Sequence, residues 1–193
     1  VGGLRGGALV IVGIAIAVSS SGSDKKTNSD GLADVDKVVS LYKGIPEKGI
    51  TLGDPKAKAT IIMFADIQCP YCRDFDISEL PEVIEKSVRP GKAKMVLRLR
   101  AFLGEDSVKG ANAINAAGLQ NKMFTASGIL YHNQGEENTG WLTDERLREI
   151  LSAVPGLDVD KALKDAQGGD TEQLIGEAET LAKTDRKVEA ETR

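Results

Sequence analysis

The stretch "TIIMFADIQCPYCRDFD", Thr60 to Asp76, holds both cysteines of the chain, two residues apart. They follow the run "ATIIMFADI", which begins at Ala59 and has the length, apolar content and β-branched content of a buried central strand. After the cysteines, apolar residues recur every three or four positions, a spacing that predicts an amphipathic helix. The cysteine pair therefore marks the point where a strand ends and a helix begins.

The residues that follow extend this pattern to a βαβ unit. The helix is expected to kink or restart at Pro81, because proline cannot continue a helix interior, and Pro90-Gly91 ends it. "KAKMVLRLRAFL" then alternates apolar and largely charged positions, which predicts a second strand with one charged face. If the two strands are parallel, the crossover between them is right-handed.

The rest of the chain divides into regions of different character. Arg5 precedes thirteen uncharged residues, "GGALVIVGIAIAV", which fall short of the ~20 needed to span a bilayer and are typical of a signal-peptide core. Apolar periodicity predicts helices through most of 105–185, with candidate N-caps at Ser107, Thr143 and Asp158. We therefore expect a signal peptide or membrane anchor (1–18), a linker and lead-in (19–50), a βαβ core (51–104), a helical subdomain (105–185) and a charged tail (186–193).

Composition excludes two classes of protein. The formal net charge is -4 and aromatic residues make up 4%, with no basic stripe, so nucleic acid is not an expected partner. Two cysteines are too few for a disulfide-stapled scaffold, and the fold must rest on an apolar core.

A C-x-x-C pair at a strand-to-helix junction has a chemical rationale. The first N–H groups of a helix lack intrahelical partners and carry partial positive charge, which favours a thiolate at Cys69. Pro70 suits the first turn and has no N–H of its own. Cys72 lies almost one turn further on, close enough to attack a mixed disulfide. The pattern predicts thiol–disulfide exchange, with Cys69 attacking and Cys72 resolving, and with no metal or organic cofactor.

Other interpretations of the cysteines are weaker. A structural disulfide across two residues would constrain the unfolded chain little. A zinc-linked interaction module needs two further ligands, and His132, the only histidine, is more often a packed or exposed residue than a ligand.

Three neighbours of the pair have two interpretations each. Asp66 either relays a proton or, as is commoner for such a residue, stabilises a turn. Arg73 either favours the thiolate electrostatically or is an ordinary exposed arginine. Tyr71 is either part of a substrate-contact surface or simply a partly exposed aromatic residue.

"FADIQCPYCRDF" resembles the active site of DsbA-like thiol:disulfide oxidoreductases of the thioredoxin superfamily. The similarity extends from Gly53-Asp54-Pro55 through "GEENTGWLTDERLREI" to about Lys183. It implies a thioredoxin-like α/β fold with a helical insertion. It also implies exchange of disulfides in secreted proteins, with protein thiols and disulfides as substrates and a redox partner protein. The N-terminal segment 1–18 agrees with this, because it predicts a chain that is exported or tethered to a membrane.

The resemblance also assigns roles to residues. It implies that Cys69 and Cys72 carry the chemistry, and that Pro70 and Tyr71 tune the reduction potential. Strongly oxidising members usually have histidine at the Tyr71 position, which implies a less extreme oxidant here. Asp66 lies where the family commonly has an acid.

One part of the family pattern has no counterpart in this sequence. In the family, the helix matching "EQLIGEAETLAKT" leads to a cis-proline loop, a β-hairpin and a closing helix, whereas no proline follows Pro155 here. The C-terminal part of the sheet is therefore expected to be missing, which leaves an unpaired sheet edge and an incomplete substrate groove. On this basis the alternative function is a catalytically impaired fragment that acts at most as a redox-poised binding module.

Overall fold

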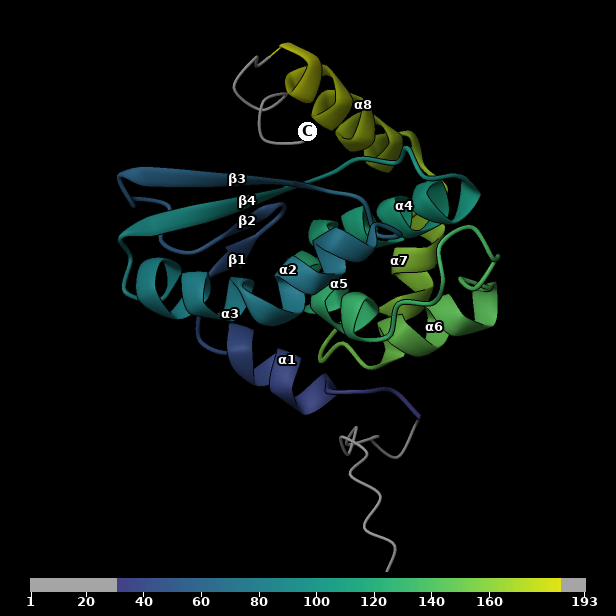
Figure 1. The fold of residues 1–193 in the computed structure, drawn as a ribbon, viewed down its shortest axis with the longest axis horizontal. Helices are drawn as coiled ribbons and strands as arrows, with labels where there is room; N and C mark the ends of the chain where they lie inside the picture. Colours follow the sequence, from purple (N-terminus) through teal and green to yellow (C-terminus); the bar gives the residue numbers. More distant parts are fainter. Residues whose placement is uncertain (1–30, 185–193) are drawn as a thin grey trace, which may run out of the picture.

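The computed structural model describes residues 31–184, in which four strands form one mixed sheet of order β1-β2-β4-β3 (Figure 1). The strands are β1 (Glu47–Lys48), β2 (Thr51–Leu52), β3 (Ala59–Ala65) and β4 (Ala93–Leu99). β3 and β4 are parallel and in register from Ala59↔Ala93 to Ala65↔Leu99, while β2 pairs antiparallel with β4. The predicted βαβ unit is confirmed.

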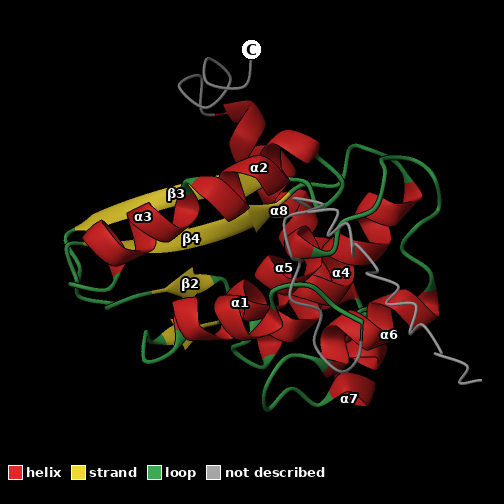
Figure 2. Cartoon of the chain, turned by 60° about the horizontal axis from the view of Figure 1, so that its bottom comes forward, coloured by secondary structure: helices red, strands yellow, loops and turns green. Residues whose placement is uncertain are grey.

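The connection between β3 and β4 is a broken helix that lies along both strands (Figure 2). It consists of α2 (Pro70–Ser78), α3 (Leu80–Val83) and a π-helical turn, η1 (Ile84–Val88). The break falls at Glu79, which places Pro81 in the first turn of α3, where its missing N–H costs nothing. The expected restart at Pro81 is confirmed.

The two faces of β4 have different environments. Alternate residues from Ala93 to Leu99 are buried on one face, where β4 contacts η1 and its side chains join the apolar core. On the opposite face, Arg98 and Arg100 pair with Glu177 and Glu179 of α8 (Gly169–Thr184), at 3.2 and 3.1 Å. Figure 1 shows α8 on one side of the sheet and α2 and α3 on the other.

Within residues 31–184, β3 is an edge strand and most of its residues are not buried, so the prediction of a buried central strand is wrong for the described part of the chain. It pairs with β4 alone, and no strand within residues 31–184 covers its outer edge. Thr60 is exposed, and 48% of Ile62 is exposed. An apolar run indicates that a segment is apolar enough to form a strand. It does not indicate the position of that strand in the sheet, which depends on residues far away in the sequence.

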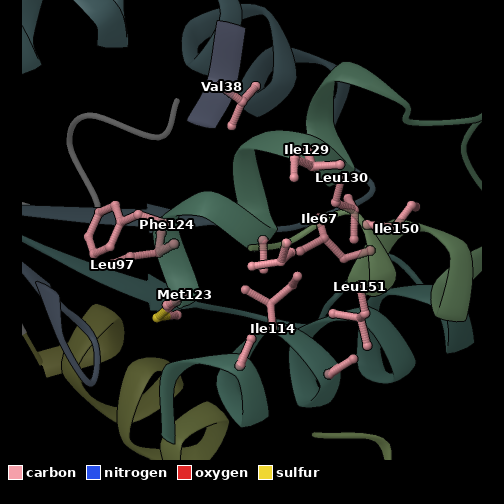
Figure 3. Close-up of a cluster of buried hydrophobic side chains, with 14 of the residues drawn as sticks. Val38, Ile67, Leu97, Ile114, Met123, Phe124, Ile129, Leu130, Ile150 and Leu151 are labelled. Atoms are coloured by element: carbon pink, nitrogen blue, oxygen red, sulfur yellow. The ribbon is translucent and has the colours of Figure 1, made fainter. Parts of the chain in front are cut away.

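Six helices complete the described chain. They are α1 (Val35–Tyr42), α4 (Glu105–Leu119), α5 (Met123–His132), α6 (Asp144–Ser152), α7 (Val159–Asp165) and α8. Helices and sheet share one core, in which buried residues of α4, α5 and α6 lie around Ile67 and near Leu97 of β4 (Figure 3). The helical nature of 105–184 is as predicted.

The N-cap predictions are partly confirmed. The Thr143 hydroxyl accepts the N–H of Arg146 at 3.1 Å, and the Asp158 carboxylate accepts that of Lys161 at 3.0 Å. Ser107 is not a cap, because α4 already begins after Gly104, whose φ of 96° suits glycine, and Ser107 lies buried inside the helix.

Both ends of the chain lie outside the described residues. The predicted leader or anchor (1–18) and the predicted charged tail (186–193) fall there. Within residues 31–184, no helix combines the length and apolar character needed to cross a membrane.

Candidate functional site

The cysteines occupy the first turn of α2. Cys69 is the N-cap, with extended backbone angles of φ −68° and ψ 118°, and its Sγ accepts the N–H of Cys72 at 3.4 Å. Pro70 occupies the first turn. Both cysteines are free and partly exposed. A helical N–H thus points at the first sulfur, in an arrangement that stabilises negative charge there.

A pocket of about 650 Å³ opens beside the cysteines. Three of the aromatic residues that line it are exposed at the surface. They are Tyr71, Phe75 and Phe102, whose exposed fractions are 83%, 40% and 55%. The Arg100 guanidinium lies 4.8 Å from the centre of the Phe102 ring. The remaining lining residues are Met63, Phe64, Ala65, Asp66, Cys69 and Cys72.

The two sulfurs differ in burial and in chemistry. Burial raises the pKa of the Cys72 thiol to about 12, and the neighbouring Cys69 contributes in the same direction. Cys72 therefore keeps its proton at neutral pH and is a poor nucleophile towards external disulfides. A sulfur of this kind reacts best within the molecule, where a mixed disulfide at Cys69 is held next to it.

Asp66 is fully buried and accepts four hydrogen bonds. Its Oδ1 accepts the N–H of Gln68 at 2.9 Å and the hydroxyl of Ser107 at 2.6 Å. Its Oδ2 accepts the N–H groups of Phe102 and Leu103 at 2.9 and 3.2 Å. The carboxylate joins the loop before Cys69 to the loop after β4 and to α4, which is the geometry of the turn-stabilising role.

His132 lies apart from the cysteines, at the C-terminal end of α5. Its Nδ1 is 3.0 Å from Oδ2 of Asp34, and burial lowers the pKa of the imidazole. Between residues 31 and 184, no three His, Cys, Asp or Glu side chains cluster in a way that could hold a metal ion. Arg73 is exposed.

Residues 46–190 match the family model described as thioredoxin. The chain belongs to the thioredoxin family. It is 30% identical over 128 residues to a probable disulfide bond formation protein D of Bacillus cereus, a match that covers 65% of this chain and 59% of that relative. This thioredoxin-family chain thus spans 59% of the relative's length.

Solved structures agree with the thioredoxin fold. Oxidised BdbD from Bacillus subtilis superposes with a TM-score of 0.64 at 17% identity, covering 70% of this chain and 75% of BdbD. Alpha-DsbA1 from Wolbachia pipientis superposes with a TM-score of 0.58 at 24% identity, covering 69% of this chain and 66% of that one. The predicted thioredoxin-like fold and the DsbA-like resemblance are confirmed.

Sequence reasoning missed two side-chain amides, those of Gln68 and Gln134, and the backbone N–H of Asn138, which together hold the loop before the cysteines in this thioredoxin-family chain. The amide of Gln68 donates to Leu103 O at 2.5 Å, and its Oε1 accepts the N–H of Asn138 at 2.9 Å. The amide of Gln134 donates to Ile67 O at 2.7 Å and to Cys69 O at 3.3 Å. Gln134 and Asn138 lie in the polar segment after α5, where no local pattern distinguishes them from solvent-exposed residues.

Replacing Asp66 by asparagine is expected to lower the free energy of unfolding by about 2–3 kcal/mol, because hydrogen bonds to a charged acceptor are lost. An amide has one oxygen, so its NH₂ group must face N–H donors that now point at a carboxylate. Urea denaturation under reducing conditions measures the change. Asp54→Asn is the matched control, since that exposed carboxylate accepts one local N–H, from Lys56. An Asp66→Asn variant as stable as the wild type would contradict the role assigned to Asp66.

Proposed function

We propose that the chain is an extracytoplasmic thiol–disulfide oxidoreductase that exchanges disulfides with protein substrates through Cys69 and Cys72. The observation that carries the proposal is the position of Cys69 as N-cap of α2, with its sulfur facing the N–H of Cys72 at the mouth of an aromatic-rimmed pocket. The names of the relatives, which refer to disulfide bond formation, support the same reaction class.

The reaction proceeds by two thiol–disulfide exchanges. In one direction, a substrate thiolate attacks Cys69 of the Cys69–Cys72 disulfide, forms a mixed disulfide and releases Cys72 as a thiolate that takes up a proton. A second substrate thiolate then attacks the mixed disulfide, forms the substrate disulfide and releases Cys69 as a thiolate. The reverse sequence starts with attack by the Cys69 thiolate and ends with attack by Cys72. No metal or organic cofactor takes part.

The neighbouring residues have supporting roles in this proposal. Pro70 and Tyr71 tune the reduction potential as the dipeptide between the sulfurs, and Tyr71, which is mostly exposed, also contacts substrate. Asp66 orders the loop that presents Cys69. The partners are protein thiols and disulfides together with a redox partner protein, and the N-terminal segment 1–18 directs export or tethers the chain to a membrane.

Exchange with a model protein tests the activity. The oxidised chain is mixed with a reduced, unfolded ribonuclease, free thiols are alkylated at successive times, and the alkylated thiols of each protein are counted separately by mass spectrometry. Insulin reduction tests the other direction. We expect substrate thiols to disappear as Cys69 and Cys72 become reduced, in a 1:1 ratio of disulfides. A cysteine pair that never forms a reversible disulfide would exclude the function. Fractionation of cells that express the whole chain tests its location outside the cytoplasm.

A redox-poised binding module is the second candidate function. It is favoured by the open outer edge of β3, which has no partner strand within residues 31–184 beside the cysteine pocket. This candidate predicts a reversible Cys69–Cys72 disulfide without multiple turnover. The ribonuclease assay distinguishes it from catalysis when it is repeated with far less chain than substrate and with glutathione disulfide as the oxidant that regenerates the Cys69–Cys72 disulfide.

A further inference from the structure

Among the hydrogen bonds that join the helical part of the chain to the cysteine loop, those of the Gln134 side-chain amide lie nearest to the sulfurs, because one of them is made to the carbonyl of Cys69 itself. Gln134 follows the C-terminal end of α5, 65 residues beyond Cys69 in the sequence. Its Nε2 donates to the carbonyls of Ile67 and Cys69, so one NH₂ group bridges two peptide units of the loop that enters α2. Asn138, four residues further along, holds Gln68 of the same loop.

We propose that Gln134 is a positioning residue that sets the redox equilibrium of the Cys69–Cys72 pair by fixing the peptide that carries Cys69. This inference rests on the proposed function. It assigns to the segment after α5 part of the control over the reduction potential of the cysteine pair.

The bond to Cys69 O determines how the N-terminus of α2 meets the sulfur. The same carbonyl accepts the N–H of Arg73 at 3.1 Å, the hydrogen bond that begins the helix. With its carbonyl held by both Arg73 and Gln134, Cys69 keeps the extended N-cap conformation in which its Sγ faces the N–H of Cys72. Without Gln134, only the helix itself holds this carbonyl, and the loop between β3 and α2 gains freedom.

This constraint matters more to the reduced state than to the oxidised state. Only the reduced state can carry a negative charge on Cys69 Sγ, and only that charge gains from an aligned helix N-terminus. In the oxidised state Sγ is bonded to Cys72 and is neutral. Loss of the Gln134 amide therefore destabilises the reduced state selectively, which makes the pair less oxidising.

The equilibrium with glutathione measures this effect directly. The Cys69–Cys72 disulfide takes up two electrons and two protons from two glutathione thiols and yields two protein thiols and one glutathione disulfide. Gln134→Met keeps the length and volume of the side chain but removes its donors. We expect the equilibrium constant for reduction to fall about fivefold, the change from one ordinary hydrogen bond. A fivefold change corresponds to about 20 mV in reduction potential.

Gln120→Met is the matched control. The Gln120 amide also bridges backbone groups, donating to Asp158 O and accepting the N–H of Asp158, both at 3.0 Å, but it joins α4 to α7 rather than to the cysteine loop. A general loss of stability should appear in both variants, whereas the redox shift should appear in Gln134→Met alone. The rate at which iodoacetamide modifies Cys69 at pH 7 should fall with the equilibrium constant.

The outcomes separate this inference from the proposed function. If the wild type forms a reversible disulfide and Gln134→Met has the same equilibrium constant, the inference is wrong and the function stands. If the wild-type cysteines do not form a disulfide at all, the proposed function is wrong, and the inference is wrong with it. Should Gln134→Met not fold, Gln134→Asn takes its place, because its shorter amide cannot reach both carbonyls. A smaller shift in the same direction supports the inference, and an unchanged constant overturns it.

Discussion

Replacing Cys72 by serine should leave a protein that attacks disulfides and then stays joined to them, whereas replacing Cys69 should abolish attack. Cys69 lies at the helix N-terminus with its sulfur in the pocket, while burial holds the pKa of Cys72 at about 12. A thiol that keeps its proton near pH 7 is a weak external nucleophile. In the proposed reaction Cys72 attacks the mixed disulfide from within, so the mixed disulfide is expected to accumulate when Cys72 is replaced.

Mass spectrometry with an aromatic disulfide such as DTNB measures both halves of this prediction. At pH 7, Cys72→Ser should form a stable 1:1 mixed disulfide. Cys69→Ser should react more slowly by roughly a hundredfold or more, given the small thiolate fraction at Cys72. The double variant Cys69→Ser/Cys72→Ser supplies the baseline. Similar rates for the two single variants would show that the sulfurs are chemically alike, and the assignment of attacking and resolving roles would then be wrong.

The chemistry of this site is largely visible in the sequence because it depends on local features. The apolar run, the cysteine spacing and Pro70 lie within a dozen residues, and each acts on its immediate neighbours. Pro81 breaks its own helix, so the restart could also be predicted. These features place Cys69 at a helix N-terminus without any information on how the rest of the chain packs.

The hydrogen bonds that hold the cysteine loop in place could not be predicted from the sequence, because residues far from the loop along the chain make them. Ser107 has the residue type of an N-cap, but its hydroxyl is bonded to Asp66, 41 positions away, while the helix begins after Gly104. Gln134 contacts the cysteine loop across a gap of 65 residues or more. The edge position of β3 likewise follows from which strands pair. Local patterns carry no information on such partners.

Asp76 is a further residue whose environment the sequence conceals. It lies on α2 one turn after Cys72, two positions from the exposed Asp74, and looks like another surface acid. In the structure it is only 4% exposed, and within residues 31–184 its Oδ2 has no hydrogen-bond partner. It lines a pocket of about 280 Å³ together with Lys37, Tyr42, Glu85 and His132, the titratable groups of α1, η1 and α5 that share that pocket. Burial raises the pKa of Asp76 from 3.8 to about 7.

Replacing Asp76 by asparagine should therefore stabilise the protein at pH 8 and change its stability little at pH 4. A carboxyl group whose pKa is higher in the folded state binds its proton more tightly there. The contribution of Asp76 to the free energy of unfolding is therefore highest at low pH. It falls as the pH rises from the unfolded-state value of 3.8 to about 7, and it is constant above that range. A shift of this size corresponds to a loss of up to roughly 4 kcal/mol at pH 8, which a neutral amide of similar shape does not suffer.

Urea denaturation of the reduced protein between pH 4 and pH 8 measures this difference. Subtracting the variant's profile from that of the wild type removes the contributions common to both, including that of Glu47, whose pKa burial also raises to about 7. Asp74→Asn, the same change at an exposed position of α2, should leave the profile unaltered. If the gap between Asp76→Asn and the wild type were equal at pH 4 and pH 8, the pKa of Asp76 would have to be the same in the folded and the unfolded protein. Its carboxylate would then need a partner that offsets the cost of burying the charge.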